Sequence, residues 1–169
     1  MRRRHNPYGN RVQDTTPVQR LHPGELRALE PWPDPPADEV DLELGIADDT
    51  DVLLVSQRSQ ALATTVGFPK PAAAALGTAL SEVSTNMVRY AQEGTIRLWV
   101  QQRDGRPGIL VEARDHGPGI ADVDQALTDG FTTGDGLGDG LGAARRLVDR
   151  FDIESRTGKG TTIRLLKWA

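Results

Sequence analysis

Apolar residues alternate with polar ones in several short stretches of the chain. In the first, Val40, Leu42, Leu44 and Ile46 are separated by acidic residues and a glycine. Alternation with a period of two predicts a β-strand that buries one of its faces. The same pattern predicts further strands at residues 96–100, 109–113, 151–155 and 162–166.

Other stretches carry apolar residues at helical spacing. A run of acids that begins at Asp48 offers an N-cap and first-turn charges for a helix of about 51–66. An Ala-rich stretch flanked by prolines predicts a second helix at 71–91, and a third helix is expected from about Leu141.

The order of these elements is strand, helix, helix, hairpin, loop, helix, hairpin, which lacks the regular βαβ alternation of a Rossmann fold. We therefore predict an α/β (α+β) two-layer sandwich, with a mixed, mostly antiparallel sheet and the helices on one face.

The N-terminal part differs in composition from the rest. Seven of the 11 prolines lie within residues 1–36, and this stretch shows little apolar periodicity. Its last residues, from Pro31 to Pro36, are typical of an extended polyproline segment. We predict a disordered or loosely attached tail at 1–38 and one compact domain at 39–169. The sequence leaves open whether the tail is a docking arm or has no role.

Composition excludes several classes of function. The 169 residues include 20 basic and 24 acidic side chains, a net charge of −4, which argues against a dedicated nucleic-acid binder. The absence of cysteine excludes disulfides and thiolate metal sites, and three widely separated histidines argue against a zinc enzyme. No apolar run approaches the roughly 18 residues of a membrane span. No apolar segment follows Arg2–Arg4 as in a secretory signal, so we expect a cytoplasmic protein.

The second predicted helix carries Glu82 and Asn86, which are four residues apart and so share one helix face. A carboxylate beside an amide oxygen can bind Mg²⁺ or polarise a hydroxyl group. A solvated polar pair is the simpler interpretation of this spacing taken alone.

The strand at 109–113 leads into a second candidate, Asp115, Gly117 and Gly119. A carboxylate at a strand end can accept a hydrogen bond from a purine amine, and the glycines allow close approach of a ligand. An ordinary turn after the strand would need the same glycines.

Two further glycine-rich segments complete the candidate chemistry. The run from Gly136 to Gly142 leads directly into a helix, where backbone N–H groups can bind phosphate. It matches neither a Walker A sequence nor a Rossmann fingerprint, and a flexible linker is the alternative. The second segment, Gly158–Thr161, lies between the last two predicted strands, where a simple hairpin turn would need no function. As part of a nucleotide pocket that includes Gly160, Thr161 could form a hydrogen bond near the base alongside Asp115.

Together, in this order over residues 76–162, these four segments resemble the GHKL, or Bergerat-fold, superfamily that includes gyrase, sensor histidine kinases and MutL. The resemblance implies that ATP and Mg²⁺ bind between the sheet, two helices and a lid at 121–137. It implies that Asn86 holds Mg²⁺ and that Glu82 is the general base. It assigns the adenine pocket to Asp115, Gly117, Gly119, Gly160 and Thr161. It assigns the phosphates to Gly138, Gly140, Leu141 and Gly142.

Within this superfamily the chain resembles the small, RsbT-like anti-sigma-factor-type serine/threonine kinases, because it has no room for a transducer domain. That branch implies a switch kinase of the stress response that phosphorylates STAS-domain proteins of the stressosome and acts on a phosphatase partner. Asp139 stands where the family more often has an apolar residue. The sequence therefore leaves a nucleotide-dependent binding module, with little or no phosphotransfer, as the alternative. It leaves the oligomeric state open.

Overall fold

The computed structural model describes residues 31–33, 35, 39–127 and 140–169. Its backbone contacts group the chain into two units, Met1–Trp32 and Pro33–Ala169, and every helix and strand below belongs to the second unit. The assignment of residues 1–38 as a tail stays a prediction.

Five strands form a single sheet in the order β1-β2-β3-β5-β4, and each neighbouring pair is antiparallel. The predicted sheet, mixed but mostly antiparallel, is confirmed in its antiparallel character, and no parallel pair occurs among the described strands. The strands are β1 (Leu42–Ile46), β2 (Gly94–Arg103), β3 (Arg106–Asp115), β4 (Arg150–Arg156) and β5 (Gly160–Trp168).

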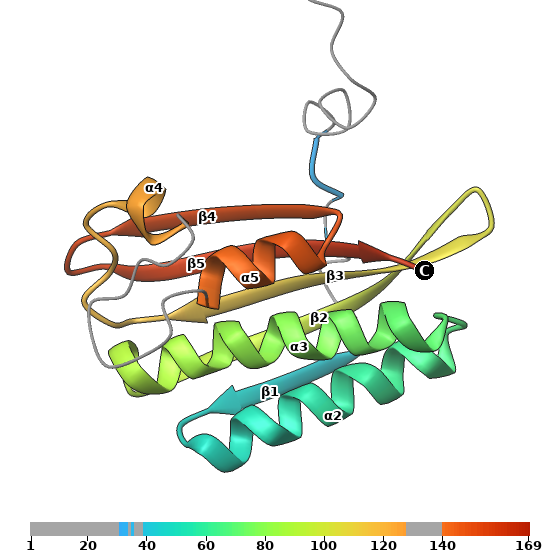
Figure 1. Ribbon diagram of the computed structural model, residues 1–169, viewed down its shortest axis with the longest axis horizontal. Helices are drawn as coiled ribbons and strands as arrows, with labels where there is room; N and C mark the ends of the chain where they lie inside the picture. Colours follow the sequence, from blue (N-terminus) through green and yellow to red (C-terminus); the bar gives the residue numbers. More distant parts are fainter. Residues whose placement is uncertain (1–30, 34, 36–38, 128–139) are drawn as a thin grey trace, which may run out of the picture. The chain divides into compact units, whose positions relative to one another are not determined.

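The longer helices lie together on one face of the sheet (Figure 1). They are α2 (Asp49–Thr65), α3 (Lys70–Asn86) and α5 (Gly140–Leu147). Two short helices are η1, a π-helix (Met87–Ala91), and α4 (Val123–Ala126). No helix among the described residues is long and apolar enough to cross a membrane.

The start of α2 follows from its sequence. Asp48 is the N-cap, and its Oδ1 accepts hydrogen bonds from the backbone N–H groups of Thr50 at 2.8 Å and Asp51 at 3.1 Å. Asp51 Oδ2 accepts in return from the Asp48 N–H at 3.3 Å, which completes a capping box. These bonds satisfy N–H groups that have no partner within the helix.

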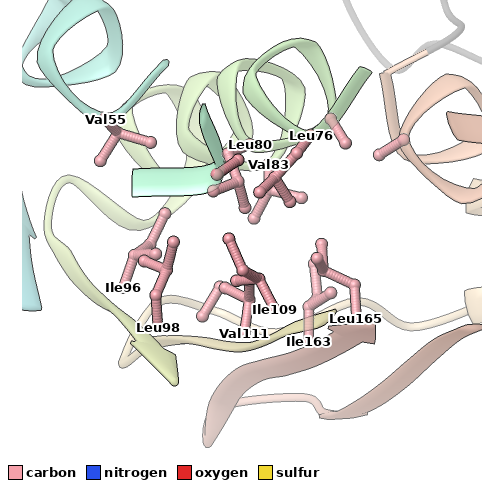
Figure 2. Close-up of a cluster of buried hydrophobic side chains, with 14 of the residues drawn as sticks. Val55, Leu76, Leu80, Val83, Ile96, Leu98, Ile109, Val111, Ile163 and Leu165 are labelled. Carbon is pink, nitrogen blue, oxygen red and sulfur yellow. The ribbon is translucent and has the colours of Figure 1, made fainter. Parts of the chain in front are cut away.

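The main core lies between the helices and the sheet. Figure 2 shows Leu76, Leu80 and Val83 of α3 pointing toward residues of the sheet. All three are fully buried, as are Ile96 and Val111 below them. Because α3 packs over the centre of the sheet, the side chains on its flanks are placed at the rim of this core.

The structure corrects the predicted helix at 71–91. The α-helix ends at Asn86, and residues Met87–Ala91 continue as a π-helix that stops at Gln92, where φ is +69°. Apolar spacing does not register one widened turn, so the pattern of the sequence read as a single helix. π turns of this kind are frequent at functional sites.

Candidate functional site

Asp115, at the end of β3, is held by the backbone around it. Its Oδ1 accepts hydrogen bonds from the N–H of Gly117 at 2.9 Å and from the N–H of Thr161 at 3.2 Å. Its Oδ2 has no partner among the described residues. The carboxylate is therefore fixed by one oxygen and has the other available to accept a hydrogen bond from a ligand.

The glycines near Asp115 are positions of close backbone contact. A Cβ atom on Gly160 would collide with the carbonyl of Asp115, and one on Gly119 with the carbonyl of Arg156. Both glycines also have positive φ, +87° and +73° respectively. A Cβ on Gly117 would lie 2.6 Å from Cβ of Ala91. Only glycine fits at these positions, so the loop after β3 and the β4–β5 turn can touch.

Ser155, on β4, was not singled out by the sequence and connects the same loops. Its hydroxyl oxygen accepts from the N–H of Ile120 at 2.8 Å and lies 2.9 Å from the hydroxyl of Thr161. The N–H of Gly158 donates to the carbonyl of Pro118 at 2.7 Å. The pairing of β4 with β5 could have suggested this role, since it places Ser155 directly opposite Thr161.

Glu82 and Asn86 lie at the C-terminal end of α3 and face the first residue of α5. A Cβ atom on Gly140 would lie 3.3 Å from Nδ2 of Asn86 and 3.4 Å from Oε2 of Glu82. Both side chains are partly exposed, and neither forms a hydrogen bond or ion pair with a described residue. The absence of a side chain at Gly140 thus leaves space between α3 and α5 that is bordered by a carboxylate and an amide.

The first turn of α5 continues the glycine-rich run. Leu141 and Gly142 are buried, and Leu141 belongs to the main core, which fixes the start of the helix against α3. The first N–H groups of a helix have no partner within it and can bind an anion. Gly138 and the greater part of the predicted lid at 121–137 lie outside the described residues.

The π-helix connects the two groups of candidate residues. It begins directly after Asn86, and its last residue, Ala91, packs against Gly117. Gly117 in turn donates to Asp115. The helix that carries the carboxylate and amide is therefore in direct contact with the loop that fixes Asp115.

The oxygen atoms of Asn86 and Glu82 suit Mg²⁺ better than a metal ion whose ligands all come from the protein. Among the described residues, no three His, Cys, Asp or Glu side chains come close enough to hold a metal. Mg²⁺ is commonly bound through one or two protein oxygens, with phosphate oxygens and water as the other ligands. Asn86 Oδ1 and the Glu82 carboxylate, beside the start of α5, offer oxygens of this kind.

Known proteins resemble this chain in sequence. A family model described as histidine kinase-like ATPase domain matches residues 46–167, from the end of β1 to the end of β5. The chain belongs to this family. The expected GHKL superfamily and its α/β two-layer fold are thereby confirmed.

Individual proteins of known name are also similar to this chain. The serine/threonine-protein kinase RsbT of Bacillus subtilis is 37% identical over 118 residues, which cover 70% of this chain and 89% of RsbT. An anti-sigma F factor of Caldanaerobacter subterraneus is 34% identical over 99 residues, 54% of this chain and 66% of that protein. Among solved structures, the mycobacterial sensor histidine kinase MprB matches 75% of this chain and 97% of its own, with 18% identity and a TM-score of 0.47.

Proposed function

We propose that this protein is an ATP-dependent serine/threonine kinase of the partner-switching type. Its substrate would be a STAS-domain protein of the stressosome. The likeness to RsbT over most of both chains supports this class of function. The observation that carries the chemistry is the approach of Glu82 and Asn86 to Gly140. A Cβ atom added to Gly140 would lie 3.4 Å from Glu82 Oε2 and 3.3 Å from Asn86 Nδ2. A phosphatase is a second expected partner.

The phosphates of ATP are assigned to the start of α5. Gly140, Leu141 and Gly142 can present backbone N–H groups there, and the helix dipole favours negative charge. Asn86 is the expected protein ligand of Mg²⁺, which would neutralise and orient the phosphates. No lysine or arginine occurs between Asp115 and Ala144. The backbone N–H groups of α5 and the Mg²⁺ ion would therefore have to neutralise the charge of the phosphates.

The adenine base is assigned to the other end of the site. Asp115 Oδ2 is oriented by the bonds that Oδ1 accepts, and it can accept a hydrogen bond from the adenine amine. Gly117, Gly119 and Gly160 let the backbone approach the flat base closely, and Thr161 adds a hydroxyl beside Asp115. An amine donor facing a carboxylate acceptor favours adenine over guanine, which presents a carbonyl at this position.

Transfer would use Glu82 as the general base. The hydroxyl oxygen of a substrate serine attacks the γ-phosphorus of ATP and forms a new P–O bond. The bond between that phosphorus and the bridging oxygen breaks, ADP leaves, and Glu82 takes the hydroxyl proton. General-base catalysis of this kind contributes about 10²–10⁴-fold to a rate.

The test is phosphate transfer from radiolabelled ATP to candidate STAS-domain proteins, with ATP binding measured separately. We expect Glu82→Gln to lose about 10²–10⁴-fold in transfer while it still binds ATP. Asn86→Ala should lose Mg²⁺-dependent ATP binding and keep its fold. Glu93→Gln, which changes an exposed glutamate after η1, is the matched control. Unchanged transfer in Glu82→Gln would remove the general base, and unchanged Mg²⁺-dependent binding in Asn86→Ala would remove the metal ligand.

A nucleotide-dependent binding module is the second candidate function. The matches to anti-sigma F factors, at 34% and 31% identity, favour it as much as they favour a kinase. Such a module would hold or activate its partner only when ATP is bound. ATP-dependent complex formation without label on any partner would select this function over the first.

A further inference from the structure

The sheet has a second face, opposite the helices, and part of it is hollowed. Side chains alternate between the two faces along a strand, and Ile96 and Ala113 belong to the main core. Their neighbours in sequence therefore lie on the second face. A hollow of about 450 Å³ opens there, where β2 pairs with β3. We call it the Arg114 hollow, and the side chains that line it are Glu93, Thr95, Arg97, Glu112, Arg114 and His116.

The hollow occupies one end of the second face. Toward the turn between β2 and β3, the register partners Trp99 and Leu110 are buried although they lie outside the main core. At the other end, Arg114 and His116 are exposed. The hollow is therefore open to solvent at the end of the strands where β3 leads into the loop after Asp115.

Two charged side chains of the hollow already have partners on neighbouring strands. Arg97 Nε lies 2.6 Å from Glu43 Oε2 on β1, and this hydrogen bond and charge raise the pKa of Arg97 above its ordinary value. Glu112 Oε2 lies 3.4 Å from Arg164 Nε on β5. Arg97 and Glu112 thus belong to a row of alternating charges that runs across the sheet.

Arg114 lies in the next row and has no such partner. Its register partners are Thr95 on β2 and Thr162 on β5, and neither carries a charge. The guanidinium of Arg114 forms no hydrogen bond or ion pair with a described residue. Opposite charges directly across a pair of strands stabilise a sheet, and here both opposite positions lack one. The positive charge of Arg114 is therefore available to a ligand.

Two further hydrogen-bonding side chains lie beside Arg114. Cβ atoms of register partners are about 5 Å apart, which brings the Thr95 hydroxyl close to Arg114. His116 follows two residues later and lines the same hollow. Neither side chain forms a hydrogen bond with a described residue. A guanidinium, a hydroxyl and an imidazole, all able to donate, thus border one space.

The acidic residues of the hollow restrict which anion it can accept. Glu93 and Glu112 line the same space and would repel a doubly charged phosphate. The net charge of the chain is −4, which also disfavours a strongly acidic ligand. A single carboxylate carries one charge, and its two oxygens can accept parallel hydrogen bonds from one guanidinium. The charges of the hollow therefore favour one carboxylate.

We propose that the Arg114 hollow is a docking site for one aspartate or glutamate side chain of a partner protein. Arg114 binds both oxygens of the carboxylate, and Thr95 and His116 donate further hydrogen bonds to it. The hollow lies on the opposite face of the sheet from α3 and α5, so a partner bound there leaves the start of α5 accessible. The proposal does not depend on the proposed kinase function.

The test uses a blocked peptide with one glutamate between glycines as the probe, and the same peptide with glutamine as its neutral counterpart. Binding is measured at low ionic strength by NMR of the isotope-labelled full chain, from the backbone amides of Thr95 and Arg114 and the Nε–H signal of Arg114. We expect saturable shifts with the glutamate peptide and none with the glutamine peptide.

Substitutions locate the site. Arg114→Gln should weaken binding of the glutamate peptide by about tenfold or more, because a hydrogen-bonded charge pair is lost. Arg114→Lys keeps the charge but not the two parallel donors, so it should also bind more weakly than the wild type. Arg58→Gln is the matched control, because Arg58 is an exposed arginine on α2 without a partner among the described residues.

Other results overturn the proposal. Equal shifts with inorganic phosphate would show an unselective anion site, and equal binding by Arg114→Gln or Arg114→Lys would show that the guanidinium does not hold the carboxylate. Equal weakening in Arg58→Gln would show attraction by charge alone. If dilution shifts the same signals and the wild type sediments as a dimer, a second copy of the chain occupies the hollow. The absence of any shift with the glutamate peptide would remove the site.

Discussion

The two ends of the candidate site are built differently. At the proposed adenine end, Asp115 Oδ1 accepts from the N–H groups of Gly117 and Thr161 at 2.9 and 3.2 Å. The Ser155 hydroxyl accepts from the N–H of Ile120 at 2.8 Å and lies 2.9 Å from the Thr161 hydroxyl. At the proposed phosphate end, Glu82 and Asn86 approach Gly140 but form no hydrogen bond or ion pair with a described residue.

The difference shows that one end is part of the hydrogen bonding that holds the fold together, whereas the other end is not. The hydrogen bonds at the adenine end also tie the loop after β3 to the β4–β5 turn, so this end forms as the protein folds. The polar groups at the phosphate end are placed by the packing of α3 against α5 and keep their bonding capacity for a ligand. Mutations at the first end should therefore cost stability as well as affinity, and mutations at the second end should cost function alone.

The largest expected effect is at Gly160. Gly160→Ala adds a Cβ that collides with the Asp115 carbonyl at a φ of +87°, so both strain and displacement follow. We expect a loss of at least about 2 kcal/mol in the free energy of unfolding, measured in urea. Gly158→Ala is the control, because Gly158 also has positive φ, +73°, but no neighbour within 4 Å. An equal loss in both variants would show that contact with Asp115 is unimportant.

Asp115→Asn tests the free oxygen at the same end. The amide oxygen can still accept from Gly117 and Thr161, but the amide nitrogen then faces the adenine amine, and both are donors. We expect ATP affinity to fall by about 10–100-fold, from the loss of a hydrogen bond to a charged group. Calorimetric titration with ATP and with GTP measures this. An affinity for ATP equal to that of the wild type would place adenine elsewhere.

Gly140→Ala examines the phosphate end, where stability and function should separate. Alanine favours a helix over glycine by up to about 1 kcal/mol, so the variant should unfold no more easily than the wild type. Its methyl group would take up space beside Asn86 and Glu82. We expect about tenfold weaker binding of Mg·ATP, or about 1.4 kcal/mol. Weaker binding together with a loss of stability would contradict the distinction between the two ends.

The smallest effect is expected at Ser155. Ser155→Ala removes the acceptor of the Ile120 N–H and a partner of Thr161. We expect about 1 kcal/mol less stability and a modest rise in the KM for ATP. Ser81→Ala, on α3 and outside this network, provides the comparison. If the two variants unfold alike, the hydroxyl of Ser155 does not hold the loops together.

Local patterns in the sequence were enough for most of the fold. Alternation identified the strand that contains Leu42 and Leu44, and the acids after Asp48 identified the start of α2. The change to a π-helix after Asn86 was missed, because apolar periodicity reports which residues face the core and not how the backbone bonds. The burial of Trp99 and Leu110 outside the main core was also missed, since alternation shows which residues share a face of a strand and not what covers that face.

The candidate site was predictable only as separate pieces. The spacing of Glu82 and Asn86 predicted a shared helix face, which α3 confirms. Their distance from Gly140 depends on the crossing of α3 and α5, which no local pattern encodes. Ser155 was missed although the pairing of β4 with β5 places it opposite Thr161, because its second partner, the N–H of Ile120, lies on a loop that no pattern positions. The roles assigned to all these residues stay predictions.

The central claim is that the two ends form one nucleotide site, and amide hydrogen exchange tests it most directly. The N–H groups of Gly117 and Thr161, which bond to Asp115, should be protected before any nucleotide is added. Mg·ATP should then protect Leu141 and Gly142 at the start of α5 strongly, while ADP protects them less. Protection that appears only at Gly117 and Thr161, with α5 unchanged at saturating Mg·ATP, would contradict the account.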